Sequence, residues 1–203
     1  MQPIANIMRA RPVWLVAASV LVGGALNASF VVVNTHLFLP LFLDSIFTAC
    51  VAALFGWLPG LFTGLWTNLA CEIMLGFPMT VLPFAICNMS TGLIVGLMSE
   101  RGQFRSGLNA LVGVLLVTVS NSVLGALIAT FLYGGITGSA AVDYVVVGLL
   151  AAGRQLFSAT FLARIPANLV DKGIAVVAAY VLLFYVTRRL AGPPPRRQAW
   201  GHR

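Results

Sequence analysis

The sequence predicts an all-α integral membrane protein with six transmembrane helices and an external loop or lid helix between the fifth and the sixth. The composition, the apolar segments and the positions of the arginines support this prediction. Of the 203 residues, 60% are hydrophobic and 8% are charged, and the mean hydropathy is +0.97. A soluble domain of this length needs more charge to cover its surface, so the lipid bilayer must be its solvent.

Six apolar segments approach the length of about 20 residues that a helix needs to cross the hydrocarbon core. They cover residues 13–33, 38–56, 58–76, 80–98, 107–132 and 167–188. The first segment lacks a convincing cleavage site and is too long for the apolar core of a signal peptide, so we interpret it as a span. Between the second and third segments, Gly56-Trp57-Leu58-Pro59-Gly60 predicts a tight turn, because proline cannot continue a helix and glycine permits a sharp reversal.

The arginines indicate the number of spans and their orientation. An apolar stretch from Asp143 to Ile165 is interrupted by Arg154 and Gln155, so it is ambiguous as a seventh span. Basic segments favour the cytoplasmic side, and here they contain Arg9, Arg11, Arg101, Arg105, Arg188, Arg189, Arg196, Arg197 and Arg203. Six spans place all of these on one side, whereas seven would place the C-terminal tail outside. We therefore predict cytoplasmic termini and an external excursion over residues 133–166.

The domain organisation follows from this topology. Residues 1–12 form a cytoplasmic segment, residues 13–190 form a single transmembrane domain, and residues 191–203 form a basic tail that we expect to be disordered. The net charge of +7 does not indicate nucleic-acid binding, because the arginines flank apolar runs. Cys50, Cys71 and Cys87 lie in apolar segments without metal-ligand spacing, so we expect packing residues and neither a metal nor a cofactor.

Polar side chains inside the spans are the candidate binding residues, because they are costly in hydrocarbon and usually face a cavity or each other. From the second span to the sixth they lie at mid-depth or in the outer half. This distribution predicts a vestibule that is open to the outside and closed below by apolar packing, not a continuous polar pore. The candidate substrate-binding residues are Asp44, Asn68, Glu72, Asn88, Asn121, Arg154, Asn168, Asp171 and Lys172.

Each candidate also has a structural interpretation. The asparagines can form hydrogen bonds between helices, Asp171 and Lys172 can form an internal ion pair, and Asp44 can cap the start of its helix. Glu72 shares a helix face with Asn68 and needs a partner, which Lys172, Arg154 or a ligand could supply.

Small residues on the first span predict a close helix contact. Ser19 and Gly23, and likewise Gly24 and Ala28, have the small-xxx-small spacing that lets two helices approach. The contact is either internal to the chain or a docking surface for a partner membrane protein.

Motifs for catalysis are absent from the sequence. It contains no GxxxxGK[ST], no HExxH and no GxSxG. We therefore expect no enzyme activity and no ATP hydrolysis by a P-loop, so active transport would need energy from elsewhere.

A series of motifs between residues 39 and 185 gives the sequence a family resemblance. The segment from Leu39 to Thr48, continuing to Gly60 and to Leu65-Trp66-Thr67-Asn68-Leu69, resembles the substrate-specific S components of energy-coupling factor (ECF) importers. The order and spacing of further matches support this resemblance: Pro83-Phe84-Ala85 through Asn88, Gly92 to Leu97, Tyr133 to Gly138, and Leu169 to Ile174.

The resemblance implies a function. Such a subunit crosses the bilayer of a bacterial or archaeal cytoplasmic membrane six times and binds a vitamin-like small molecule from outside. It docks on a transmembrane coupling protein driven by two ATPase subunits. The small-residue face of the first helix would be the docking surface, and the loops 34–37 and 133–166 would act as gates.

Two alternatives remain open. One is a membrane sensor domain that binds a small ligand and signals to a partner protein, although the cytoplasmic tail is short and has no output domain. The other is an intramembrane enzyme using Asp44, which the missing motifs disfavour.

Overall fold

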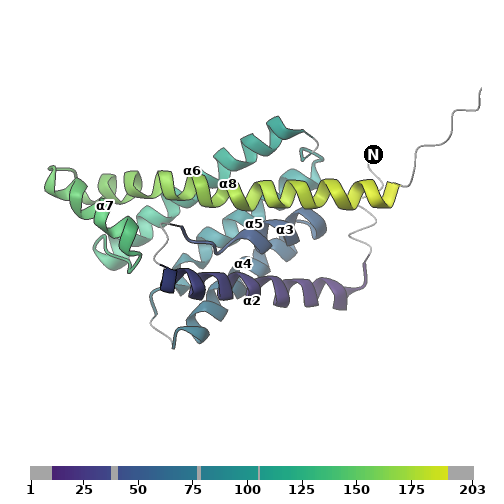
Figure 1. Cartoon of the computed structure of the whole chain (residues 1–203), viewed down its shortest axis with the longest axis horizontal. Coiled ribbons are helices and arrows are strands. Elements are labelled where there is room, and N and C mark those ends of the chain that lie inside the picture. Colours follow the sequence, from purple (N-terminus) through teal and green to yellow (C-terminus); the bar gives the residue numbers. More distant parts are fainter. Residues whose placement is uncertain (1–10, 38–40, 77–78, 105, 192–203) are drawn as a thin grey trace, which may run out of the picture.

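Helices make up every regular element in the described residues, 11–37, 41–76, 79–104 and 106–191, of this computed structural model (Figure 1). Seven are α-helices and one is a short 3-10 helix, η1. In chain order they are α2 (Val13–Leu37), α3 (Ile46–Phe55), α4 (Trp57–Met74), η1 (Leu82–Phe84), α5 (Ala85–Glu100), α6 (Gly107–Tyr133), α7 (Ala140–Ala151) and α8 (Leu156–Ala191). Most of the predicted tail, 191–203, lies outside the described residues, as do Arg9, Arg105, Arg196, Arg197 and Arg203.

Four helical segments are long and apolar enough to cross a membrane. They are α2, the continuous segment Leu82–Glu100, α6 and α8. Helix α4 has 18 residues but carries Asn68 and Glu72, and it is not among the four. Helix α3 has 10 residues and is about 15 Å long, half of the roughly 30 Å hydrocarbon core. The all-α, multi-pass prediction is therefore confirmed, whereas helix length alone does not establish six crossings.

The second predicted span, 38–56, becomes helical only at Ile46. The preceding segment from Leu41 to Ser45 is not helical, and Leu43 has a φ of 54°. Side chains from other elements bind its backbone: the Leu43 N–H donates to Asp171 at 2.7 Å, and Asn88 donates to the Asp44 carbonyl at 2.7 Å. These bonds replace the ones that a longer helix would make, which hydropathy cannot reveal.

The predicted excursion, 133–166, contains helix α7 and the first turns of α8. Helix α8 begins at Leu156, not near residue 167, and continues for 36 residues through Pro166. A proline inside a helix removes one backbone hydrogen bond, but neighbouring helices let membrane proteins tolerate it.

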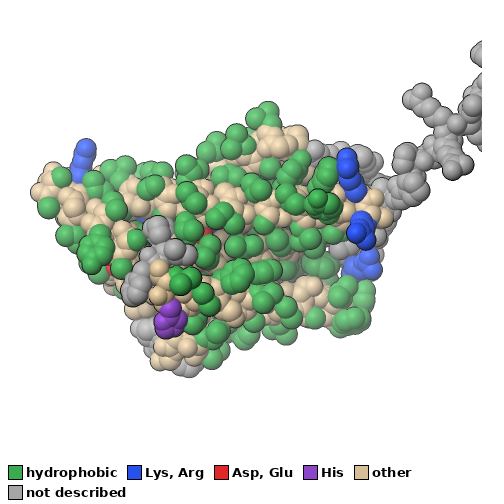
Figure 2. Space-filling model, in the orientation of Figure 1, with side chains coloured by type: hydrophobic (Ala, Val, Ile, Leu, Met, Phe, Trp, Pro, Cys, Tyr) green, Lys and Arg blue, Asp and Glu red, His purple; other side chains and the backbone are tan. Residues whose placement is uncertain are grey.

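Cationic side chains gather at the end of the molecule where α2 begins and α8 ends (Figures 1 and 2). Among them are Arg188 and Arg189 in the last turn of α8. Between the two ends the visible surface is mostly hydrophobic (Figure 2). Large exposed apolar side chains of the described helices include Leu26, Phe62, Val119 and Val177, as expected for a surface that contacts lipid.

The half of the bundle nearer this cationic end is closed by small and branched apolar side chains. Ala49, Ala52, Val95, Val117 and Val176 are fully buried in one cluster formed by α3, α5, α6 and α8. The buried charged residues of the described chain, Glu72, Asp143, Arg164, Asp171 and Lys172, all lie outside this cluster.

Glycines bring α4 and α5 into backbone contact. A Cβ on Gly92 would overlap the backbone of Gly60, and a Cβ on Gly96 would overlap the backbone of Trp57. Small residues at a helix interface allow this approach in membrane proteins.

Replacing Gly92 with Ala should lower the thermal unfolding temperature of the purified protein, because the added methyl group must push α4 and α5 apart. Overpacking of this kind costs roughly 1–3 kcal/mol. The matched control is Gly148→Ala in α7, where a Cβ would meet no atom within 4 Å. Equal unfolding temperatures for the two variants would contradict the α4–α5 contact.

Candidate functional site

A cavity of about 350 Å³ occupies the half of the bundle away from the cationic end. Residues of α2, α4, α5, α6, α7 and α8, and of the segments that connect them, line it. Its volume lies within the range of about 300–1,000 Å³ that is usual for small-molecule sites. Five predicted binding residues contribute to the lining: Asp44, Asn68, Asn121, Asn168 and Lys172.

Much of the lining is apolar. Val31, Phe42, Leu75, Val81 and Phe84 face the cavity together with the polar groups. A site of this composition suits an organic molecule with an apolar body and a few polar groups.

Lys172 forms the centre of a buried charge cluster. Its Nζ lies 2.6 Å from Asp44 Oδ1, 2.7 Å from Asp171 Oδ2 and 2.9 Å from Ser45 Oγ. The contacts with Asp44 and Ser45 are hydrogen bonds, and the contact with Asp171 is an ion pair. The side chains of Lys172 and Asp171 are 1% exposed and that of Asp44 is 18% exposed, so Asp44 is the charged group of the cluster that a ligand can reach.

Asp171 has a structural position. It does not line the cavity, and its Oδ1 accepts the Leu43 N–H at 2.7 Å. The adjacent pair of Asp171 and Lys172 thus ties α8 to the non-helical segment before α3, and Asp44 extends the predicted internal ion pair to three charges.

The buried asparagines connect helices and loops. Asn68 donates to the Val81 carbonyl at 2.9 Å, Asn121 donates to Thr91 Oγ1 at 3.1 Å, and Asn168 donates to Ser122 Oγ at 3.0 Å. Asn88 donates to the Asp44 carbonyl and does not line the cavity. The amide groups of these residues therefore have structural partners, and three of them also border the cavity.

Glu72, one of the predicted binding residues, binds the backbone of a turn instead of facing the cavity. Its carboxylate accepts the backbone N–H groups of Met79, Val81 and Leu82 at 2.9, 2.6 and 2.6 Å, and it does not line the cavity. Neither Lys172 nor Arg154 is its partner. The charge is satisfied by backbone donors, which bind carboxylates strongly, so Glu72 fixes the turn that leads into α5.

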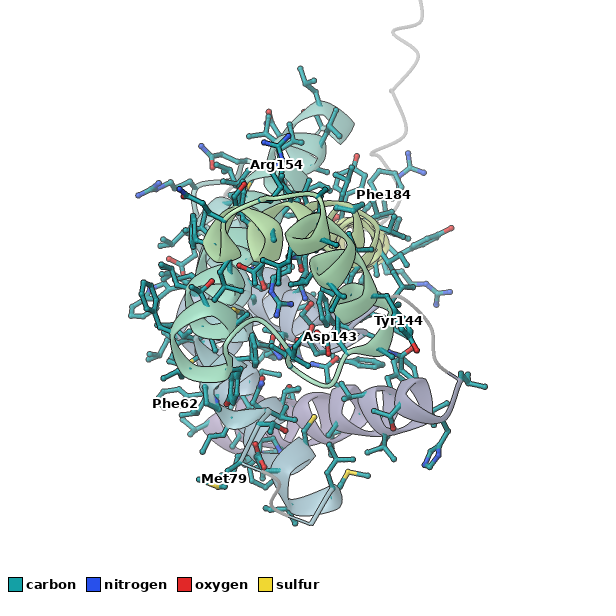
Figure 3. All side chains as sticks on the ribbon, turned by 90° about the vertical axis from the view of Figure 1, so that its left-hand side faces the viewer. Phe62, Met79, Asp143, Tyr144, Arg154 and Phe184 are labelled. Atoms are coloured by element: carbon teal, nitrogen blue, oxygen red, sulfur yellow. The ribbon has the colours of Figure 1, made fainter. Side chains whose placement is uncertain are left out.

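Arg154 lies away from the cavity. It is exposed in the turn between α7 and α8 and is not part of the lining. Figure 3 looks onto this end of the molecule, with Arg154 in its upper part and Asp143 nearer the middle.

Arg164 is the charged residue of the cavity lining that the sequence analysis missed. It is 2% exposed and lines the cavity. Treating residues 133–166 as an external excursion implied a solvated arginine. Arg164 nevertheless precedes Asn168 and Lys172 at intervals of four residues, so all three lie on one face of α8. This spacing could have identified Arg164 as a candidate binding residue from the sequence.

The predicted docking residues pack inside the protein. Gly23, Gly24 and Ala28 are buried, and a Cβ on Gly24 would overlap the Trp66 ring. The hydroxyl of Ser19 donates to the Leu15 carbonyl of the same helix. The small residues of α2 therefore bring α3 and α4 close, and the three buried ones offer no surface to a partner.

Comparisons with known proteins identify one family. Residues 13–183 match the sequence model described as "ECF transporter, substrate-specific component". No curated protein and no solved structure matches the chain at the required significance.

Replacing Lys172 with Met should destabilise the protein strongly, because Asp44 and Asp171 lose their counter-ion. Breaking a buried ion pair in this way costs roughly 3–5 kcal/mol, measured as a lower thermal unfolding temperature in detergent. The triple variant Lys172→Met/Asp44→Asn/Asp171→Asn, which removes the charges together, should recover part of the loss. A single variant as stable as the wild type would contradict the cluster.

Replacing Glu72 with Leu should loosen the turn before α5, because three backbone N–H groups lose their acceptor. Hydrogen exchange at Val81 and Leu82 should accelerate by about tenfold or more, since hydrogen bonds to charged groups contribute roughly 1.5–3 kcal/mol each. The amide of Arg101, which donates to the Leu97 carbonyl, provides the internal control. Unchanged exchange at Val81 and Leu82 would contradict the role of Glu72.

Proposed function

We propose that this chain, which belongs to the family of ECF transporter substrate-specific components, captures a vitamin-like small molecule in the 350 Å³ cavity. The cavity is the single observation that carries the proposal. It combines an apolar lining with a reachable carboxylate at Asp44, and the apolar cluster of the other half closes it below. A cavity that is closed on one side can hold a molecule without letting it pass through the subunit.

The proposal includes six membrane crossings: α2, residues 41–55, α4, Leu82–Glu100, α6 and α8. In the second crossing, the non-helical segment from Leu41 to Ser45 complements the short helix α3. Non-helical backbone is tolerated inside a membrane where the protein satisfies its polar groups, as Asp171 and Asn88 do here. An even number of crossings agrees with the common end at which α2 begins and α8 ends (Figure 1).

The charge distribution supports an orientation. The end that carries Arg188 and Arg189 would face the cytoplasm, following the preference of basic residues for that side. The cavity half would then face the outside, where a substrate arrives.

Helix α7 and the loop before it are suited to serve as the gate. Thr137, Gly138 and Ser139 of the loop line the cavity, as do Ala140 and Ala141 at the start of α7. Glycines with positive φ occur in this loop at positions 134, 135 and 138. We propose that this segment moves away to admit the substrate and returns to cover it.

Transport itself requires partners. Membership of this family implies that the chain binds a small-molecule substrate and works with the other subunits of an ECF transporter. We propose a transmembrane coupling protein and two ATPase subunits as these partners, because the chain has no P-loop motif of its own. Gly23, Gly24 and Ala28 of α2 do not form their docking surface, since α3 and α4 already cover them.

Replacing Val31 with Trp should weaken capture by filling the cavity that Val31 lines. Its matched control is Val33→Trp on the same helix, where the side chain is 53% exposed on the outer surface. Each variant is purified in detergent, and the small molecules that it retains are measured by mass spectrometry. We expect Val33→Trp to retain what the wild type retains and Val31→Trp to retain about tenfold less, equivalent to 1.4 kcal/mol of affinity.

The same preparations are tested for folding by size-exclusion chromatography, so that loss of retention is not mistaken for loss of structure. A folded Val31→Trp protein with undiminished retention would show that capture does not occur in this cavity. A wild type that retains no compound, and that no small molecule stabilises thermally, would overturn capture itself, because a bound ligand must raise stability.

A further inference from the structure

The buried side chain of Arg164 forms part of the cavity wall. Its guanidinium Cζ lies 5.4 Å from the centre of the Phe84 ring, and its Nη2 donates to Thr137 Oγ1 at 3.3 Å. A Cβ on Gly125 would lie 3.3 Å from Arg164 Cδ and 3.6 Å from Nε. Phe84, Thr137 and Gly125 thus hold the side chain in one position at the cavity wall.

The guanidinium group lacks enough partners for a buried cation. The long hydrogen bond to Thr137 is the only one that it makes among the described residues, and its buried Nε has no partner. None of the described carboxylates forms an ion pair with Arg164, in contrast to Lys172. A buried charge is normally paired, and an arginine offers five N–H donors in a planar fork. The missing partner of Arg164 is therefore an anion.

The start of α7 faces the same part of the cavity. Ser139 is the N-cap residue and makes no capping hydrogen bond with its side chain, and Ser139, Ala140 and Ala141 line the cavity. The first backbone N–H groups of a helix have no partner within the helix and attract negative charge. Thr137 connects this helix start to Arg164.

Negative charges near the cavity favour an anion with a single charge over one with two. Asp143 lies in the first turn of α7, and its carboxylate accepts the N–H groups of Thr137 and Gly138. Asp44, Asp171 and Lys172 together carry one net negative charge. A doubly charged phosphate would meet repulsion from these groups, whereas a carboxylate matches the single charge and the planar fork of one arginine.

We propose that Arg164 and the start of α7 bind a carboxylate group of the captured molecule. This inference rests on the proposed function and assigns a substrate class to its cavity, organic acids. Arg164 and Lys172 lie eight residues apart on α8, which corresponds to about 12 Å along the helix. The reachable oxygen of Asp44, beside Lys172, accepts a hydrogen bond from a donor group at the other end of the same molecule.

The experiment measures binding to the full-length protein purified in detergent. The probe is the dialysable fraction of a cell extract in three forms: untreated, methyl-esterified to neutralise its acids, and treated with alkaline phosphatase. Compounds that bind to the protein are identified by mass spectrometry. The variants are Arg164→Met, Arg164→Lys and the matched control Arg154→Met, which removes an exposed arginine outside the cavity.

We expect the wild type and Arg154→Met to bind an acid from the untreated and phosphatase-treated fractions and to bind nothing from the esterified one. Arg164→Met should bind the acid about 30-fold more weakly or worse, as for a truncated partner of a buried charge pair. Arg164→Lys should fall between the two, because lysine keeps the charge and loses the planar fork. Size-exclusion chromatography monitors the fold of each variant.

Each contrary result identifies what failed. A bound compound without an acidic group, or equal binding from untreated and esterified fractions, overturns the carboxylate and leaves capture intact. Loss of binding after phosphatase treatment would show that a phosphate is the anion and also overturns it. Undiminished binding by a folded Arg164→Met protein excludes Arg164. A wild type that binds nothing from any fraction overturns the proposed function together with this inference.

Discussion

Three non-helical segments surround the cavity of a protein that lies in lipid, and their backbone groups must find partners within the chain. Carboxylates supply many of them: Asp171 binds the segment before α3, Glu72 binds the turn before α5, and Asp143 binds the loop before α7. The irregular cavity wall depends on these bonds. Three of the five acidic residues in the sequence serve this purpose, which explains why charges that are costly in a membrane are present at all.

This requirement divides the buried polar residues into two groups. Glu72, Asp171 and Asn88 each make at least one hydrogen bond to the backbone and do not border the cavity. Arg164 borders it with a buried Nε that has no partner among the described residues, and Asp44 borders it with a carboxylate that is 18% exposed. A polar residue inside a membrane is a functional candidate by default, but the distinction between a used and an unused hydrogen-bonding group requires the structure.

The sequence was sufficient to predict the helical class and the membrane environment, because both depend on hydropathy along the chain. It was insufficient for Leu41 to Ser45, because the apolar composition of this segment predicts a helix. Hydrogen bonds with the side chains of Asp171 and Asn88 instead hold its backbone in a non-helical conformation. The partners of Glu72 lie in a turn seven to ten residues away, which helix periodicity does not describe. Arg164 was missed because its position was inferred from a loop boundary, although its spacing to Lys172 follows the helix period.

Pro166 lies between Arg164 and Lys172, the two cationic residues that α8 brings to the cavity. Its ring removes the backbone hydrogen bond that residue 166 would donate to the Leu162 carbonyl, and sharp helix bends usually occur at such positions. Beyond it, α8 continues from Lys172 to Arg188 over 16 residues, a rod of about 24 Å. A molecule held at both residues would connect the parts of α8 on either side of Pro166. The stiffness of α8, the helix that reaches the opposite face, would then differ between an empty and a filled cavity.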